Sequence, residues 1–256
     1  MLPYVSLVFA WDPTAGVHAT WHFIATLRRH HAALSAAIVP YQVIVVEWCR
    51  EPVAGGIGQA VRAALPGLAG HLVVYQVDSA YHEAFNQNPS LRFPEFIARN
   101  AGIRRATGSY VLAADVDAPL TDDVVELLAH RALSPMLLYQ VRGGLLLDRF
   151  SWHRLRGFNE VYRVNTAAAS PSFTLRARAA GVQPVALGRP IARSEAVLPW
   201  ERVSWRNPPE WGLGGALELK RGAGDYRLAY DASAVPPLVA LGSLSREAAL
   251  TRSGRT

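Results

Sequence analysis

Short apolar runs alternate with segments of helical spacing through the first half of the chain. The run Tyr41–Glu47 is almost entirely apolar and β-branched, which is typical of a strand buried on both faces. The segment Val17–Ala33 instead has apolar residues at helical spacing. This alternation predicts parallel strand–helix–strand units. The expected strands are Tyr4–Ala10, Tyr41–Glu47, His71–Val77 and Ser109–Ala114, and the expected helices are Val17–Ala33, Ile57–Leu65, Phe93–Ala106 and Thr121 to about Ala132.

The pattern becomes less regular after Pro135, and it is polar and turn-rich over residues 78–89. The region Pro190–Gly224 is rich in Pro, Gly and Trp and predicts a long, irregular flap. We expect residues 1–241 to form one α/β domain and residues 242–256 to form a flexible tail. The later strands are expected over Met136–Val141, Gly144–Leu147 and Gln183–Leu187, and the later helices over Phe150–Arg156 and Ser172–Ala180.

The composition narrows the class of protein. A chain of 256 residues, 50% of them apolar, can bury a sizeable core and is not disordered. Cys49 is the only cysteine, which excludes a disulfide scaffold and a cysteine-based zinc site. No apolar run reaches the roughly 18 residues of a membrane span. The N-terminus has no basic leader, so the expected compartment is the cytoplasm.

The formal net charge is +6, and Lys220 is the only lysine among the 26 basic residues. This excess of arginine reflects either codon usage or anionic ligands, since the planar guanidinium group binds phosphate with two parallel hydrogen bonds. The sequence has no basic tract and no alternation of aromatic and basic residues of the RNA-binding kind. We therefore expect no nucleic-acid partner.

Two carboxylates, Asp115 and Asp117, follow the strand expected over Ser109–Ala114. Ligands of open α/β sheets bind at the carboxyl ends of the strands. Carboxylate oxygens suit Mn²⁺ or Mg²⁺, which can bridge a diphosphate. The pair therefore predicts a divalent metal site, although a pair at this spacing can also simply cap a turn.

The helix before these carboxylates combines polar and core residues. Ile97, Ala101 and Arg104 share one face, and Asn100 lies beside them. An arginine and an asparagine on such a face need partners, which a nucleotide phosphate or ribose would provide. The alternative is an ordinary surface helix.

Taken in order, these features resemble the nucleotide-sugar glycosyltransferases of the GT-A fold, and family 2-like members in particular. The resemblance covers about Tyr4 to Leu187 and also includes the segment Gly157-Phe158-Asn159-Glu160. It implies a Rossmann-like mixed sheet flanked by helices, with a C-terminal flap. It also implies a nucleotide-binding half over residues 1–118 and an acceptor half with the flap over residues 119–241.

The resemblance further implies a nucleoside diphosphate sugar donor, in particular a UDP-sugar, and an acceptor that is a glycan, a lipid or a small molecule. Asp115 and Asp117 would hold the metal, Mn²⁺ or Mg²⁺. Glu160 and Asp148 would line the donor-sugar and acceptor side, where either could act in catalysis. The residues assigned to the nucleotide and metal are Asp12, Glu47, Arg99, Asn100, Arg104, Asp115 and Asp117.

One departure concerns the catalytic base. Inverting members of this family carry an acidic pair ahead of a Leu-Arg helix. Counting back from Leu175 gives Ala169, Ser170 and Ser172 as the corresponding positions, and none of the three is acidic. A substitute base at Glu160 or Asp148, a retaining mechanism and a lost activity all fit this departure.

Three functions therefore stay open, as does the oligomeric state. The first is a metal-assisted glycosyltransferase, and the second is a catalytically degenerate nucleotide-binding module. The third is a nucleotidyltransferase, which fits less well because the first loop is poor in glycine and lacks any basic residue.

Three lesser features have ordinary interpretations. His18 and His22 are one helical turn apart but have no obvious third metal ligand, and Gly55–Gly58 resembles a flexible loop more than a phosphate loop. The flap tryptophans Trp200, Trp205 and Trp211 either contact an acceptor or fasten the flap to the body.

Overall fold

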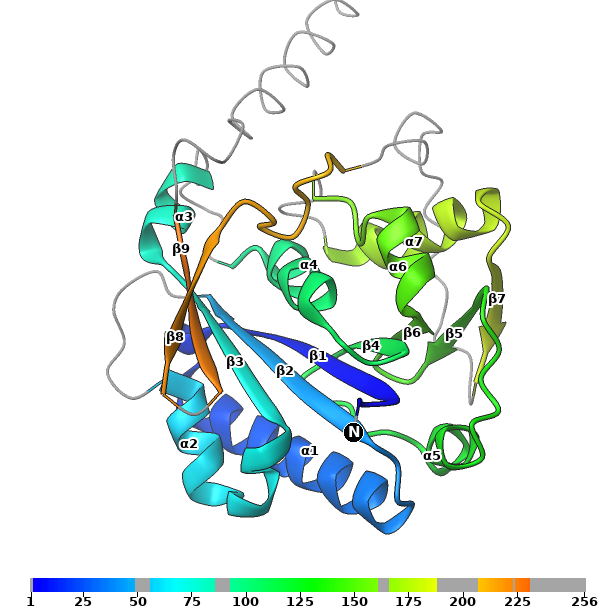
Figure 1. Cartoon of the computed structure of the whole chain (residues 1–256), viewed down its shortest axis with the longest axis horizontal. Coiled ribbons are helices and arrows are strands. Elements are labelled where there is room, and N and C mark those ends of the chain that lie inside the picture. The colour runs from blue at the N-terminus through cyan, green and yellow to red at the C-terminus, as the bar shows by residue number, and fades with distance from the viewer. Residues whose placement is uncertain are drawn as a thin grey trace, which may run out of the picture.

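The computed structural model describes residues 2–48, 56–85, 93–160, 166–187, 207–222 and 224–230. Their strands are β1 (Val5–Trp11), β2 (Tyr41–Trp48), β3 (Leu72–Val77), β4 (Tyr110–Ala114), β5 (Leu137–Val141), β6 (Gly144–Asp148), β7 (Gln183–Ala186), β8 (Leu217–Arg221) and β9 (Asp225–Ala229). They form one mixed sheet in the order β7-β5-β6-β4-β1-β2-β3-β9-β8 (Figure 1).

Helices cover both faces of this sheet (Figure 1). The helices are α1 (Gly16–Ala36), α2 (Gly56–Ala64), α3 (Ser79–Phe85), α4 (Glu95–Arg105), α5 (Asp122–Ala129), α6 (Arg149–Leu155) and α7 (Thr166–Ala179), with short 3₁₀ turns at Pro13–Ala15 and Pro66–His71. Alternate residues of β1 enter the two cores. Leu7 and Phe9 join side chains of α1, α2 and α5, whereas Val8 and Ala10 join side chains of α4, α6 and α7.

The centre of the sheet explains the continuous apolar runs of the sequence. Strands β4, β1, β2 and β3 are neighbours and run parallel, and every residue of β1 is buried. Parallel strands that are covered on both faces have no solvent side and therefore show no polar alternation. The expected mixed α/β sheet with flanking helices is confirmed.

Helix α4 lies unusually close to the sheet. A Cβ atom on Gly102 would lie 2.5 Å from Val8 Cγ1 and 3.1 Å from Val46 Cγ2, so only glycine fits at this contact. The close approach buries both Arg99 and Asn100 of this helix. Their polar groups therefore need partners inside the protein or in a ligand.

Four elements differ from the sequence expectation. Helix α3 forms in the segment expected to be turns, where Asp78 Oδ1 accepts a hydrogen bond from Ala80 N at 3.0 Å. Helix α7 begins six residues earlier than expected and contains Pro171. Strand β8 lies inside the expected irregular flap, and strand β9 was not expected at all. Both were missed because neither strand has a strong apolar pattern, and every residue of β8 is exposed.

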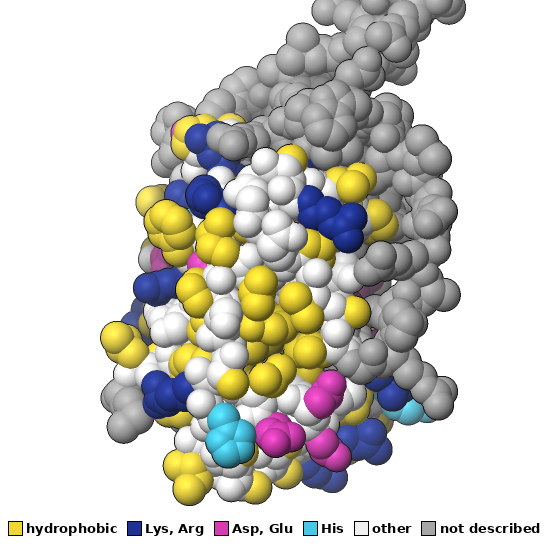
Figure 2. All heavy atoms as spheres, turned by 90° about the vertical axis from the view of Figure 1, so that its right-hand side faces the viewer, with side chains coloured by type: hydrophobic (Ala, Val, Ile, Leu, Met, Phe, Trp, Pro, Cys, Tyr) yellow, Lys and Arg dark blue, Asp and Glu magenta, His cyan; other side chains and the backbone are white. Residues whose placement is uncertain are grey.

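The outer edge of the sheet beside β5 is formed by β7, which pairs with β5 in parallel. Figure 2 looks onto this end of the molecule, where apolar side chains gather in the middle and acidic side chains gather below them. Pro184 lies in β7 and has no N–H, which makes this edge a poor template for a further strand.

Within the described ranges, no helix is both long and apolar enough to cross a membrane.

Candidate functional site

The carboxyl ends of the central parallel strands meet at one edge of the sheet. Trp11, at the end of β1, pairs with Glu47 near the end of β2, and Val8 pairs with Ala113 of β4. Asp12 and Asp115, the residues that directly follow β1 and β4, therefore lie at the same edge. We call this region the carboxylate edge.

Asp115 is fixed from two sides. Its backbone N–H donates to the Gly143 carbonyl oxygen at 2.7 Å, and its Oδ1 accepts from Arg99 Nη2 at 2.5 Å. The same Arg99 nitrogen lies 2.5 Å from Glu95 Oε1, one turn earlier on α4. The Asp115 side chain is nevertheless 45% exposed, so one side of its carboxylate faces solvent.

Arg99 keeps donor capacity that the protein does not use. The residue is only 7% exposed, and its Nε has no hydrogen-bond partner in the described part of the chain. An unsatisfied donor on a buried guanidinium group is costly unless a ligand or water accepts from it. Arg99 is therefore suited to contact an anion bound at the carboxylate edge.

Asp117 is the exposed carboxylate of the pair. No group of three or more His, Cys, Asp or Glu side chains among the described residues could by itself hold a metal ion. Mg²⁺ commonly takes only one or two protein carboxylates and completes its shell with substrate phosphates and water, and Mn²⁺ also prefers such oxygen ligands. Asp115 and Asp117 thus fit a divalent ion that arrives with a diphosphate, and not one held by the protein alone.

A tight hairpin between β5 and β6 supports the carboxylate edge. Gly143 has a φ of +73°, and a Cβ atom there would lie 2.0 Å from Ala118 Cβ and 3.7 Å from Asp115 Cβ. A Cβ on Gly144 would lie 2.4 Å from the Ala113 carbonyl oxygen. The Arg142-Gly143-Gly144 segment is therefore a tight turn packed against the loop that carries Asp115.

His30 of α1 is a buried histidine whose pKa is influenced by the backbone of Ala118, in the loop after β4. The imidazole is 1% exposed, packs against Phe9 and has no hydrogen-bond partner in the described ranges. Burial lowers the pKa of His30 to about 4, and the Ala118 backbone, near but outside hydrogen-bond geometry, opposes part of this shift. His30 is therefore neutral at physiological pH.

Glu47 is placed at the carboxylate edge but is 1% exposed. Its Oε1 accepts from the Ile57 N–H at 2.8 Å, and its Oε2 accepts from Gln76 Nε2 at 2.8 Å. A Cβ on Gly56 would lie 2.7 Å from Oε2. Gly56, the first residue of α2, thus lets the N-terminus of this helix bind the protein's own carboxylate. Glu47 therefore has partners within the protein and does not need the expected nucleotide to satisfy its charge.

Asp12 lies where the sequence placed it, directly after β1. Its Oδ1 accepts from the Thr14 N–H at 2.9 Å and from Thr14 Oγ1 at 2.7 Å. These bonds start the Pro13–Ala15 turn and leave the side chain partly exposed at the carboxylate edge.

Asn100 binds the chain itself. Its Oδ1 accepts from the Phe158 N–H at 2.8 Å, and its Nδ2 donates to the Phe158 carbonyl oxygen at 2.8 Å and to Glu160 Oε1 at 2.9 Å. Glu160 Oε1 also accepts from the Gly212 N–H at 2.8 Å, and the Glu160 N–H donates to Asn207 Oδ1 at 3.0 Å. Asn100 and Glu160, expected at the nucleotide and the acceptor, thus join α4 to residues 158–160 and 207–212.

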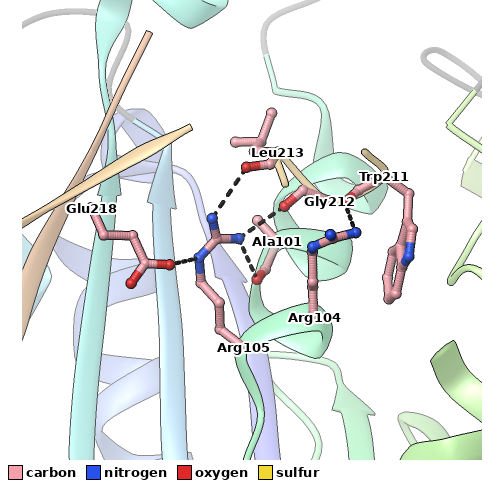
Figure 3. A network of polar contacts seen from close by, with 7 residues as sticks. All are labelled: Ala101, Arg104, Arg105, Trp211, Gly212, Leu213 and Glu218. Carbon is pink, nitrogen blue, oxygen red and sulfur yellow. Dashed lines mark hydrogen bonds and ion pairs between the residues drawn. The ribbon is translucent and has the colours of Figure 1, made fainter. Parts of the chain in front are cut away.

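Arg104 has a similar role (Figure 3). Its Nη1 donates to the carbonyl oxygens of Pro209 at 2.8 Å and Trp211 at 3.1 Å, and its guanidinium group lies over the Trp211 ring. Burial lowers the pKa of Arg104, and the neighbouring charge of Arg105 adds to this shift. The Arg104 side chain is turned toward residues 209–211, whereas Arg99, five residues earlier, faces Asp115.

Arg105 binds the neighbouring residues 212 and 213 (Figure 3). It donates to the carbonyl oxygens of Ala101, Gly212 and Leu213 and pairs with Glu218 of β8 at 2.5 Å. Arg105 is therefore a structural residue, which does not fit the alternative of an ordinary surface helix. Trp211 is 3% exposed and lies in the core, so the described part of the expected flap is fastened to the body. Trp200 and Trp205 lie outside the described residues, as do Cys49, Gly55 and residues 242–256.

Asp148 is not brought to the carboxylate edge. It pairs with Tyr110 at the start of β4, whereas Asp115 follows the end of that strand. Its Oδ1 caps α6 by accepting from the Ser151 N–H at 2.8 Å, and its Oδ2 accepts from the Met136 N–H at 3.1 Å. The expectation that Asp148 lines the donor-sugar side is corrected for this reason.

The first half of α7 holds the three positions at which the sequence resemblance led us to look for an acidic pair. Ala169 and Ser172 are fully buried, and Ser172 Oγ has no hydrogen-bond partner in the described ranges. Ser170 lies one turn before Thr174, whose Oγ1 donates to the Ser170 carbonyl oxygen at 3.0 Å. The structure therefore adds no acid at these three positions.

Two polar residues of the site were not found from the sequence. Glu95 is one helical turn before Arg99, a spacing that could have indicated the ion pair. Asn207 is 1% exposed and binds backbone groups of Arg156, Phe158 and Glu160, but nothing in its sequence surroundings indicates this.

The pair His18 and His22 has its Nε2 atoms 3.0 Å apart on the exposed side of α1.

Comparison with solved structures gives the class of this fold. The chain is similar to the catalytic domain of Drosophila beta1,4-galactosyltransferase 7 in complex with xylobiose, with 14% identity, 89% of this chain and 94% of that chain covered, and a TM-score of 0.50. An aspartate variant of the same enzyme with manganese, UDP-Gal and xylobiose has 16% identity, coverage of 88% and 92%, and a TM-score of 0.47. TarS of S. aureus has 15% identity, coverage of 72% and 57%, and a TM-score of 0.46.

These similarities concern the fold. By sequence, no family profile and no curated protein matches the chain. The mixed sheet with helices on both faces is that of the GT-A glycosyltransferases, so the fold implied by the sequence is confirmed.

Proposed function

We propose that this protein is a glycosyltransferase that uses a nucleoside diphosphate sugar, in particular a UDP-sugar, with a divalent metal ion. The observation that carries this proposal is the Arg99–Asp115 pair at the carboxylate edge. It places a half-exposed carboxylate beside a buried guanidinium group that keeps an unused donor. A diphosphate with its metal offers the anionic oxygens for the arginine and the cation for the carboxylates.

In this proposal the residues have separate roles. Asp117 and Asp115 hold Mn²⁺ or Mg²⁺, which, when bound, neutralises charge on the leaving diphosphate. Arg99 orients Asp115 and donates to the diphosphate. Asp12 lies on the nucleoside side, toward β1 and β2, and the transferred sugar and a glycan or other acceptor lie on the opposite side. Glu47, Asn100 and Arg104 hold the surrounding chain in place.

The base of the reaction is a separate question. Asp148 lies at the other end of the sheet, and Glu160 is 5% exposed with its Oε1 bound to Asn100 and Gly212. A group that removes a proton from an acceptor needs direct or water-mediated contact with it. We therefore favour a reaction that does not depend on either residue.

The missing acid pair also supports a second candidate function, a nucleotide-binding module without catalysis. Ala169 and Ser172 are buried in a neutral part of α7. This module would bind UDP with Mn²⁺ through the same residues but would not transfer a sugar. The nucleotidyltransferase hypothesis gains no support from the described residues.

Calorimetry of UDP binding with and without Mn²⁺ tests the nucleotide site, and donor hydrolysis then separates the two functions. We expect Mn²⁺-dependent binding that is lost in Asp117→Ala, while the exposed position leaves folding unchanged. Slow hydrolysis of a UDP-sugar by the wild-type protein supports the transferase, and binding without turnover supports the module. UDP binding that does not depend on Mn²⁺ or on Asp117 would contradict the proposed metal site.

A further inference from the structure

Arg142 is an exposed cation beside the carboxylate edge that the proposed function does not use. It is in the two-residue turn between β5 and β6, directly before Gly143, whose carbonyl oxygen binds the Asp115 N–H. The close contacts of Gly143 and Gly144 with Ala118 and Ala113 fix this turn against β4 and its loop. Arg142 is therefore attached to a rigid support next to Asp115.

Arg142 also has no charged partner in the described part of the chain. Unlike Arg62, Arg99 and Arg105, it makes no ion pair and no hydrogen bond through its side chain to any described residue. An arginine held beside a ligand site with all its donors free is available to a bound anion.

The position of Arg142 in the sheet indicates which part of a ligand it meets. From β4, the neighbours β1 and β2 lie on one side, and β6 and β5 lie on the other. With the nucleoside toward β1 and β2, the sugar and the acceptor extend from the diphosphate toward the β5–β6 turn. Arg142 then lies on the sugar side of the diphosphate.

The strand that leads to Arg142 contacts α7. Gln140, two residues earlier in β5, donates to Thr174 Oγ1 at 3.2 Å, and Thr174 in turn donates to the Ser170 carbonyl oxygen. Ala169, Ser170 and Ser172 place no carboxylate here. Among the described residues, the turn of this hairpin therefore contributes one positive charge, Arg142, to the region between the carboxylate edge and α7.

We propose that Arg142 binds a carboxylate or phosphate group on the sugar side of the diphosphate, so that the protein prefers an acidic sugar as donor or an acidic acceptor. This inference rests on the proposed nucleotide-sugar site and adds the substrate class to it. The guanidinium group would bind the anion through charge-assisted, bidentate hydrogen bonds. Such a contact discriminates an acid from the neutral sugar of the same shape.

The test uses two donors that differ only at C6, UDP-glucose and UDP-glucuronate, with UDP as the reference. Calorimetry of the full chain with Mn²⁺ measures all three dissociation constants. We expect the wild type to bind UDP-glucuronate about tenfold more tightly than UDP-glucose, a difference of about 1.4 kcal/mol. In Arg142→Gln this preference is lost, while UDP binding is unchanged. Arg29→Gln, which removes a similarly exposed arginine from α1, keeps the preference.

A second arm tests the acceptor as the source of the anion. With UDP and Mn²⁺ bound, saturation-transfer NMR compares cellobiose with cellobiouronic acid. A preference for the acid that Arg142→Gln removes, in either arm, supports the proposal and identifies the source. The proposal is overturned if neither arm shows a preference for the acid, or if such a preference persists in Arg142→Gln. In that case, normal UDP binding still supports the proposed nucleotide site. Failure of the wild type to bind UDP at all overturns both.

Discussion

Arg99 Nη2 lies 2.5 Å from Asp115 Oδ1 and 2.5 Å from Glu95 Oε1, so one buried nitrogen connects α4 with the first residue of the loop after β4. The arginine is almost fully buried, whereas Asp115 is half-exposed. A rigid cation therefore holds a carboxylate that solvent and ligands can still reach. This relationship links the packing of α4 to the chemistry of the carboxylate edge.

The first prediction concerns Arg99→Gln. The variant leaves Glu95 and Asp115 without their shared cation, so we expect the free energy of unfolding to fall by about 1–3 kcal/mol. UDP affinity with Mn²⁺ should fall about tenfold or more, since the diphosphate also loses a donor. Urea denaturation and calorimetry measure the two effects. Arg99→Lys keeps the positive charge but loses the planar guanidinium group with its several donors, so it should recover only part of the affinity. Unchanged affinity in Arg99→Gln would show that Arg99 does not contact the nucleotide.

The second prediction concerns the hairpin glycines. Gly143→Ala combines a φ of +73° with a Cβ 2.0 Å from Ala118 Cβ, so it should displace the Asp115 loop. Gly181→Ala is a matched control, because its φ of +82° imposes the same backbone strain while no atom lies within 4 Å of the new Cβ. We expect Gly181→Ala to cost about 1 kcal/mol of stability, with normal UDP binding. Gly143→Ala should cost more and weaken Mn²⁺-dependent UDP binding. Equal effects of the two substitutions would argue against a supporting role for the turn.

The third prediction separates a structural from a catalytic Glu160. Glu160→Gln weakens the bonds from Asn100 Nδ2 and the Gly212 N–H, so we expect a loss of about 1–3 kcal/mol in unfolding free energy. UDP binding should not change. Donor hydrolysis below the unfolding temperature should also be retained. A stable variant that has lost hydrolysis would instead identify Glu160 as a catalytic residue.

The fourth prediction concerns pH. The folded pKa of His30 is about 4, below the unfolded value of about 6.5. Between these values the unfolded chain binds more protons, so stability falls as the pH falls, by about 3 kcal/mol in total, and is fully present above pH 6.5. His30→Leu should remove this part of the pH dependence, whereas the exposed His130→Leu should not. Denaturation curves between pH 4 and pH 7 measure it, and parallel wild-type and His30→Leu profiles would refute the assignment.

The sequence predicted the central fold because its signals are local. The buried runs of β1 and β2 and the Asp115–Asp117 pair after β4 can be recognised without knowledge of distant residues. Strands β8 and β9 could not be recognised in this way. Every residue of β8 is exposed, and neither strand has a continuous apolar run. Strand β9 joins β3 from about 150 residues away in the sequence, with Arg62 binding Asp225.

The polar face of α4 shows the limit of sequence reasoning about sites. Asn100 and Arg104 were expected to need partners, and the resemblance assigned Arg99 to the nucleotide; all three have partners within the protein. The sequence cannot tell whether a buried polar group is satisfied by a ligand or by a distant segment of the same chain. For Asn100 and Arg104 the partners are residues 158–160 and 209–211, and only Arg99 reaches the carboxylate edge.

A crystal structure of the protein with UDP and Mn²⁺ tests the central claim most directly. The account predicts Mn²⁺ bonded to Asp117 and to diphosphate oxygens, with Arg99 within hydrogen-bond distance of the bound nucleotide or its phosphates. The nucleoside should lie toward Asp12 and the end of β1. A nucleotide bound away from the ends of β1 and β4, or a metal ion with no contact to Asp115 or Asp117, would contradict it.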